Sequence, residues 1–91
     1  MKDKMAEPGG KLIINLEEAD LKRDTETFGT MDPYCKIKYN GKEHKSPVKT
    51  DAGKHPKWNW RLELDIFDVM DGILFQVWNS NTFSDDMIAH T

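Results

Sequence analysis

The longest strictly alternating segment of the chain runs from Trp58 to Ile66, and it constrains the fold more than any other feature. Apolar side chains recur at every second position, and polar or charged side chains lie between them. Successive side chains of a strand point to opposite faces, so a period of two indicates a half-buried β-strand. We expect this strand to lie at the centre of the core. Its apolar positions are Trp58, Trp60, Leu62, Leu64 and Ile66.

Four more strands are expected from the pattern of apolar residues. The segment 11–17 alternates cleanly, and the segment 33–39 places Cys35, Ile37 and Tyr39 on one face with lysines on the other. Another strand is expected over 73–78, and a further one begins at 87–89. Short strands with turn signals between them and no helical pattern favour an antiparallel β-sandwich.

A hairpin is expected where Asn40-Gly41 follows the segment 33–39. Both residues tolerate positive φ, which the tight turns between antiparallel strands require. The returning strand is expected over 42–49. Pro47 lies within it and has no N–H to donate to a neighbouring strand, so we place this strand at a sheet edge.

The composition narrows the class of protein. The 91 residues suit one domain with a thin core. The first ten are polar, include Pro8-Gly9-Gly10 and are expected to form a flexible tail, which leaves 11–91 as the domain. A formal net charge of -3 argues against nucleic-acid binding. The single cysteine cannot form an internal disulfide, which favours a cytoplasmic location.

Five short motifs then follow one another in a fixed order along the chain. They are Gly10-Lys11-Leu12, Met31-Asp32-Pro33-Tyr34, Pro56-Lys57-Trp58-Asn59, Val77-Trp78-Asn79 and Asp86-Met87-Ile88-Ala89. In order and spacing they resemble the C2 family, a calcium- and phospholipid-binding module, and especially its small single-domain plant members. The resemblance covers nearly all of 10–89. It implies an all-β, antiparallel Greek-key sandwich of the C2 type.

The resemblance also implies a Ca²⁺ site, since many C2 domains bind this ion through carboxylates on two loops at one end of the sandwich. The corresponding positions here are Glu26, Asp32, Asn79, Asn81 and Asp86. The family usually has aspartate at all of them, and Ca²⁺ affinity falls as carboxylates are lost. Asp24 and Asp85 lie nearby and are available to compensate. We therefore expect Ca²⁺ binding to be weak or absent.

Two structural alternatives stay open for these acidic residues. Asp32, which precedes Pro-Tyr, can order its own loop by accepting hydrogen bonds from backbone amides. Asp85 and Asp86 can simply form a solvated acidic loop.

A second candidate site is basic. Lys36 and Lys38 match the strand that some C2 domains use for phosphoinositide head groups, and Lys42, Lys45 and Lys49 follow on the hairpin partner. Each lysine near an anionic membrane contributes about 1 kcal/mol. The alternative is a solvated face whose lysines protect a sheet edge from pairing.

The aromatic residues divide into loop and strand positions. Phe28 and Phe83 lie in the two long loops, where they can enter a bilayer interface or pack back on the loops. Trp58, Trp60 and Trp78 are expected to anchor the core. Trp60 occupies a position that is usually polar in the family, so it can instead form an exposed contact.

No catalytic motif is present. The three histidines are scattered, and none accompanies a nucleophile in a recognisable pattern. We expect a module that docks peripherally on anionic phospholipid membranes and is not an enzyme. The alternative is a Ca²⁺-independent protein-interaction module without lipid affinity.

The end of the chain raises a further expectation. C2 sandwiches continue with more strands after the D-x-I-G motif, whereas this sequence ends at Thr91. Either it is part of a longer protein, or the 91 residues leave sheet edges and apolar positions open. Open edges recruit other strands, so we expect self-association or marginal stability.

Overall fold

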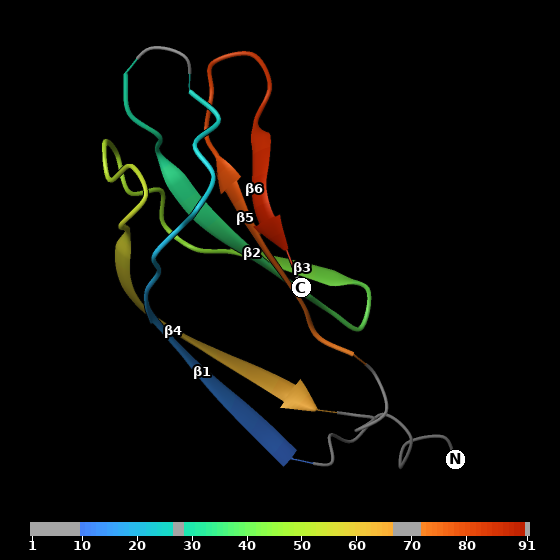
Figure 1. The fold of residues 1–91 in the computed structure, drawn as a ribbon. Coiled ribbons are helices and arrows are strands. Elements are labelled where there is room, and N and C mark those ends of the chain that lie inside the picture. Colours follow the sequence, from blue (N-terminus) through green and yellow to red (C-terminus); the bar gives the residue numbers. More distant parts are fainter. Residues whose placement is uncertain (1–9, 27–28, 67–71, 91) are drawn as a thin grey trace.

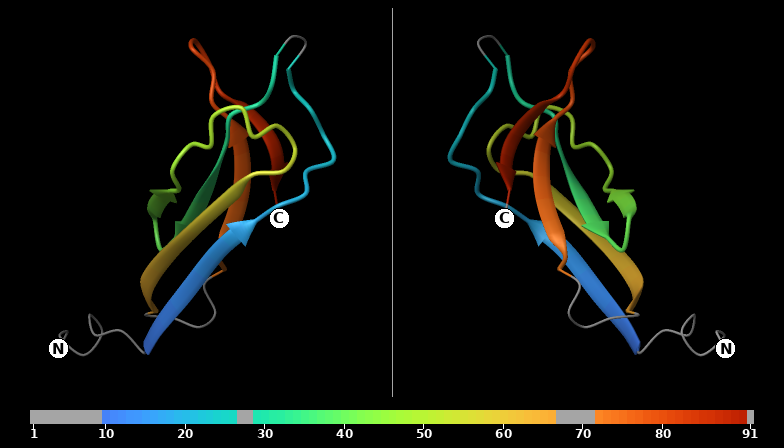
Figure 2. Two further views of the ribbon diagram at one scale, coloured as in Figure 1. Left: turned by 90° about the vertical axis from the view of Figure 1, so that its left-hand side faces the viewer. Right: turned by 90° about the vertical axis from the view of Figure 1, so that its right-hand side faces the viewer.

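The computed structural model describes residues 10–26, 29–66 and 72–90, which form six strands in two antiparallel sheets. The strands are β1 (Gly10–Glu18), β2 (Pro33–Tyr39), β3 (Lys42–Lys45), β4 (Lys57–Ile66), β5 (Leu74–Asn79) and β6 (Asp86–His90). One sheet has the order β3-β2-β5-β6, and the other consists of β1 and β4 (Figure 1). Figure 2 shows the two sheets as separate layers. The predicted antiparallel β-sandwich is confirmed.

The core is centred on β2. Cys35, Ile37 and Tyr39 are buried there and pack with Leu64 of β4. This corrects the expectation that β4 lies at the centre. β2 has a hydrogen-bonded strand on each side, whereas β4 pairs only with β1 among the described strands. Three of the five alternating apolar residues of β4, Trp60, Leu62 and Ile66, stay half-buried.

The hairpin between β2 and β3 has the predicted turn, in which Asn40 and Gly41 both adopt positive φ, at 51° and 73°. β3 lies at the sheet edge as predicted, but it ends at Lys45 and does not continue to residue 49. The side chain of Ser46 interrupts the strand, because Ser46 Oγ accepts the Cys35 N–H at 2.7 Å. Pro47 follows and has no N–H to donate.

In the smaller sheet, β1 and β4 pair over nearly their full lengths. Leu12 lies opposite Leu64 and Ile14 opposite Leu62, and these side chains face the core. Ile13 points the other way and is 46% exposed. The register shifts between Leu16 and Glu18, next to Asn59 with its positive φ. One residue more on β4 than on β1 over this stretch is the pattern of a β-bulge.

Two loops extend from the same end of the sandwich in every view. Their described parts are residues 19–26 and 29–32, which precede β2, and residues 80–85, which join β5 to β6; we call this region the loop end (Figures 1 and 2). A second apolar cluster of Leu21, Met31 and Ile88 supports it from below. Within the part of the chain that is described, no helix is long and apolar enough to cross a membrane.

Candidate functional site

Asn79 is the buried centre of the loop end, with 1% of its surface exposed at the end of β5. Its Oδ1 accepts the backbone N–H of Asp32 at 2.8 Å. Its Nδ2 donates to Thr25 Oγ1 at 3.0 Å and to Glu26 Oε2 at 2.5 Å. One amide therefore joins two parts of the loop before β2 to the end of β5.

Asp32 is fixed by its own backbone and by its side chain. Its carbonyl oxygen accepts the Ser80 N–H at 3.0 Å. Its carboxylate accepts the backbone N–H of Asp51 at 2.7 Å, which holds the loop between β3 and β4 against the loop end. The sequence left open that Asp32 orders its own loop through backbone amides; its carboxylate instead accepts an amide N–H from the loop between β3 and β4, 19 residues away.

The loop 80–85 is organised around Asp85. Tyr34 donates its hydroxyl to Asp85 Oδ2, and the Asn81 N–H donates to Asp85 Oδ1 at 2.9 Å. These hydrogen bonds, the one from Tyr34 first, lower the pKa of the Asp85 carboxyl. Burial, reinforced by Asp85, raises the pKa of the Tyr34 hydroxyl. Asp85 is thus a structural anchor for this loop.

The remaining acidic candidates lie at the surface of the loop end. Asp86 is exposed and accepts Asn81 Nδ2 at 2.9 Å. Asp24 accepts the Glu26 N–H at 2.9 Å, closing a local turn. Phe28 lies outside the described residues. Phe83 is 98% exposed on the loop between β5 and β6.

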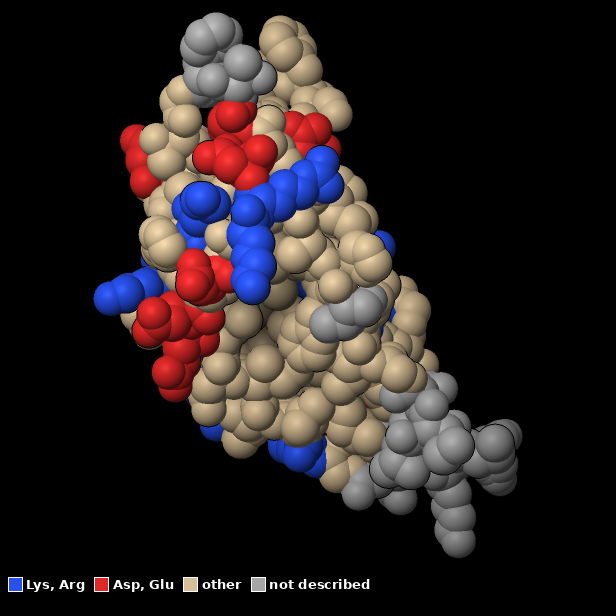
Figure 3. Space-filling view, in the orientation of Figure 1, with Lys and Arg blue, Asp and Glu red and all other residues tan. Residues whose placement is uncertain are grey.

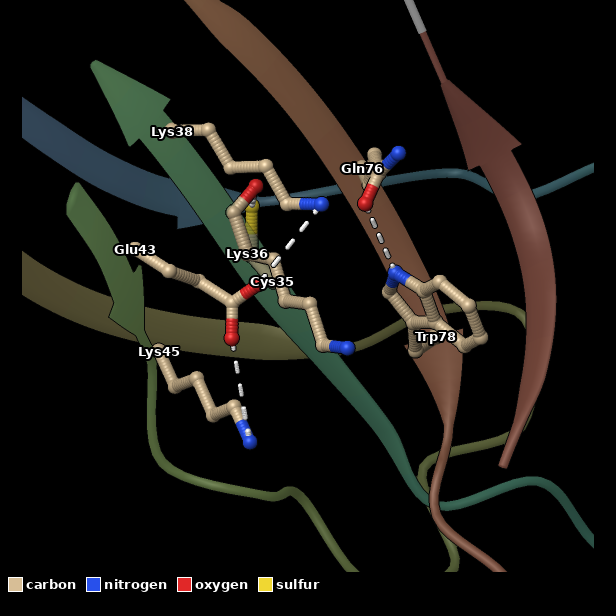
Figure 4. A network of polar contacts seen from close by, with 7 residues as sticks. All are labelled: Cys35, Lys36, Lys38, Glu43, Lys45, Gln76 and Trp78. Atoms are coloured by element: carbon tan, nitrogen blue, oxygen red, sulfur yellow. Dashed lines mark hydrogen bonds and ion pairs between the residues drawn. The ribbon is translucent and has the colours of Figure 1, made fainter. Parts of the chain in front are cut away.

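The second candidate site is the outer face of the β3-β2-β5 sheet, which we call the lysine face. It comprises Lys36, Lys38, Glu43, Lys45, Gln76 and Trp78, which the strand registers place on one side (Figure 4). Lys36 of β2 lies directly opposite Lys45 of β3 and, on the other side, opposite Gln76 of β5.

Two contacts organise the lysine face. The Lys36 ammonium lies 4.1 Å from the centre of the Trp78 ring, and Trp78 Nε1 donates to Gln76 Oε1 at 3.1 Å. A cation over an indole ring is attracted by the negative face of the ring. Glu43 lies between the other two lysines, 3.6 Å from Lys38 Nζ and 3.9 Å from Lys45 Nζ (Figure 4).

The other two candidate lysines are placed differently. Lys42 lies opposite Tyr39, so it projects from the face opposite to that of Lys38 and its neighbours. Lys49 follows β3, and its N–H donates to the Pro33 carbonyl oxygen at 3.0 Å. The register therefore separates Lys42 from the lysine face. Figure 3 shows blue basic side chains on the viewed face directly below the red acidic side chains near the loop end.

Comparison with known proteins decides the family. The family model for the C2 domain matches residues 10–91. The chain belongs to the C2 domain family. The chain is 38% identical over 82 residues to 16 kDa phloem protein 1 of Arabidopsis thaliana, covering 85% of this chain and 53% of that protein. This chain therefore spans about half the length of that relative.

The solved structures agree on the fold. The tandem C2 domains of Extended-Synaptotagmin 2, described as calcium bound, superpose with a TM-score of 0.82 at 23% identity, covering 92% of this chain and 34% of that one. A single C2 domain of a plant Extended Synaptotagmin 1 gives a TM-score of 0.82 at 21% identity, covering 92% and 67%. At these identities the likeness concerns the fold.

Among the described residues of the loop end, the oxygens are not all turned toward one point, as the ligands of a Ca²⁺ site are. Asn79 turns its amide nitrogen, not its oxygen, toward Glu26, and both oxygens of Asp85 accept hydrogen bonds from protein. In the described ranges 10–26, 29–66 and 72–90, no group of three or more His, Cys, Asp or Glu side chains is placed to hold a metal.

Sequence reasoning missed the partners that organise the two sites. Trp78, expected in the core, lies instead on the lysine face opposite Tyr34. It is two residues from Gln76 on β5, so both side chains point to the same side of the sheet. Glu43 and the hydroxyl of Tyr34 carried no signal that a single sequence reveals, since their roles depend on the pairing of β2 with β3 and on the course of the loop 80–85. Trp60 is half-buried and packs on the core.

Proposed function

We propose that this C2 domain docks peripherally on anionic phospholipid membranes through the lysine face and Phe83, with weak or absent dependence on Ca²⁺. The observation that carries the proposal is the direct opposition of Lys36 and Lys45 on neighbouring strands. Like charges in this position destabilise a sheet. Trp78 and Glu43 offset part of this repulsion, and an anionic surface lying against the two lysines would offset more of it.

The electrostatics favour modest affinity. The lysine face carries three lysines against Glu43, and Asp85 is close enough for Lys36 and Lys45 to lower its pKa further. At about 1 kcal/mol for each lysine near the surface, partly offset by these carboxylates, we expect weak and salt-sensitive attraction. Phe83 supplies an apolar contact, since burying a phenylalanine side chain contributes about 1.5–3 kcal/mol.

We also propose that the domain is not an enzyme and that it acts in the cytoplasm. In support, burial raises the pKa of the Cys35 thiol to about 11, which keeps the thiol protonated and unreactive. The cysteine is also free and buried, as expected for a protein of a reducing compartment.

The test is co-sedimentation with phosphatidylcholine vesicles, with and without phosphatidylserine, in EDTA or in Ca²⁺. We expect binding only to the anionic vesicles and to the same extent in both solutions. The variant Lys36→Glu with Lys38→Glu is expected to lose binding. A matched control, Lys42→Glu with Lys54→Glu, makes the same change of charge away from the lysine face and is expected to retain most of it.

Three outcomes would overturn the proposal. They are equal loss of binding in the two lysine variants, binding that needs Ca²⁺, and no binding by the parent protein. The last outcome would favour the second candidate, a protein-interaction module. The mixed charges around Trp78, with Glu43 between two lysines, are suited to a polar protein surface as well.

A further inference from the structure

We infer that the side-chain amide of Asn79 takes the place of a bridging cation, so that it closes the loop end without metal. Most contacts within the loop end join segments distant in the chain, and those made by Asn79 join residues 47, 53 and 54 positions away. No other side chain described at the loop end combines hydrogen bonds to three residues with burial of this degree.

The orientation of the amide follows from the backbone. The N–H of Asp32 can only donate, so the atom that it meets at 2.8 Å must be the amide oxygen. The amide nitrogen then faces the opposite direction, toward Glu26 and Thr25. The hydrogen bond to the Asp32 N–H therefore holds the positive end of the Asn79 amide dipole, its NH₂ group, against the Glu26 carboxylate.

The same geometry explains why a carboxylate would act differently at position 79. An aspartate could still accept the Asp32 N–H, but its second oxygen would meet the Glu26 carboxylate, where the parent protein has a 2.5 Å hydrogen bond. Two carboxylates at this distance repel each other, and neither has a donor for the other. Only a cation or a new donor between them would close the loop again.

Asn79 is therefore a positioning residue that makes closure of the loop end independent of divalent cations. The inference rests on the proposed cation-independent docking for its functional meaning. Its test uses the protein without lipid, so that the two proposals can fail separately.

The experiment moves the negative charge from position 26 to position 79 and then measures thermal unfolding in EDTA. We expect Asn79→Asp to lower Tm by about 5–10 °C, because a buried charge replaces a hydrogen-bond donor. The double variant Asn79→Asp with Glu26→Gln restores a donor facing an acceptor, and we expect it to recover at least half of the loss. Addition of Ca²⁺ is expected to leave Tm of the parent protein unchanged.

The matched control is Asn15→Asp, which introduces the same charge at an exposed position on β1 opposite Arg61. We expect its Tm to stay within about 2 °C of the parent value, as for most surface substitutions. The inference is overturned if Asn79→Asp behaves like this control, if Glu26→Gln gives no recovery in the double variant, or if Ca²⁺ raises Tm of the parent protein. A merely structural asparagine would not be rescued by a change at position 26.

Discussion

The two sheets of this C2 domain both contain strands with regularly alternating apolar residues, but those residues are buried to different degrees. In the four-stranded sheet, Ile37 of β2 is 0% exposed and its inward neighbours Cys35 and Tyr39 are 2% and 5% exposed. In the two-stranded sheet, Leu12, Ile14 and Leu16 of β1 remain half-buried although they alternate cleanly. The regularity of a strand's alternation therefore does not by itself determine how deeply its apolar residues are buried.

The edges of the two sheets differ as well. β3 is four residues long, carries three charged side chains and stops before Pro47, which are features that discourage pairing with another chain. β1 is nine residues long, contains no proline and pairs only with β4 among the described strands. The larger sheet thus has a protected edge at β3, whereas β1 presents a long one.

The largest expected effect concerns burial. We expect Ile37→Ala to lower the free energy of unfolding by about 3–4 kcal/mol, because it leaves a cavity in a closed part of the core. Ile14→Ala is expected to cost about 1 kcal/mol, since its site is half open. Urea denaturation followed by tryptophan fluorescence measures both. If Ile37→Ala does not fold, Ile37→Val is measured in its place, with an expected loss of about 1 kcal/mol in the free energy of unfolding. Equal costs for Ile14→Ala and Ile37→Ala would contradict the comparison.

The next effect concerns the β1 edge. If two copies pair antiparallel through β1 about Ile14, Leu12 meets Leu16 and Lys11 meets Glu17 of the other copy, so apolar and charged positions both match. We propose that the 91-residue chain self-associates in this way. In Glu17→Lys, Lys11 of each copy would face a lysine at position 17 of the other, which gives two repulsive pairs. We expect the dissociation constant of the dimer to rise about tenfold.

Light scattering at low ionic strength checks this prediction, and added salt should reduce the difference between the parent and Glu17→Lys. Because Glu17 lies at the register shift and has no assigned partner on β4, the substitution should leave the monomer fold intact. A parent chain that stays monomeric at high concentration would show that the β1 edge does not recruit a second copy.

A smaller effect is expected where β2 meets the loop 80–85. Tyr34→Phe removes the hydroxyl that donates to Asp85, and we expect a loss of about 1 kcal/mol at neutral pH. Because the folded-state pKa of Asp85 is lowered, its stabilisation is present above the ordinary value of 3.8 and is lost as the pH falls through the folded-state pKa. The difference between the two proteins in chemical denaturation should therefore shrink in acid. A constant difference would contradict the assignment.

The smallest effect is expected at the protected edge. Glu43→Gln removes the carboxylate between Lys38 and Lys45, and the pairs it forms are exposed, so the stability should change by less than about 0.5 kcal/mol. Affinity for anionic vesicles should rise about two- to fivefold, because one repulsive charge is lost. Vesicle titrations at equal ionic strength measure this, and a decrease in affinity would mean that Glu43 orients the lysines for binding.

Much of the fold could be predicted because strands and turns leave local signals. The alternation of 11–17 and the Asn40-Gly41 turn each depend on neighbouring residues alone, and both are confirmed. The ranking of burial could not be predicted, since it depends on which strands pair. For the same reason the sequence grouped Lys42 with Lys36, although the pairing of β2 with β3 places them on opposite faces.

The candidate site was predictable only as a set of positions. The motifs contain Asp32, Asn79 and Asp86, and Asp85 was named only as their neighbour. The loss of charge at position 79 was visible in the sequence. What could not be read from the sequence is the direction of each polar atom. The Asn79 amide is oriented by a backbone N–H from a segment 47 residues away, and Asp85 receives the hydroxyl of Tyr34 from 51 residues away.

These long separations also bear on how the chain folds. The hairpin of β2 and β3 and the pair of β5 and β6 can form locally, but β1 must wait for β4, and Thr25 and Glu26 must wait for Asn79. Closing long segments of chain costs entropy before their contacts are made, so folding is slow when such contacts dominate. We expect the loop end to be completed late, after the central strands have paired. Until β4 has been added, the apolar side of β1 has no partner strand, so the order in which the chain is completed also sets how long that surface stays open.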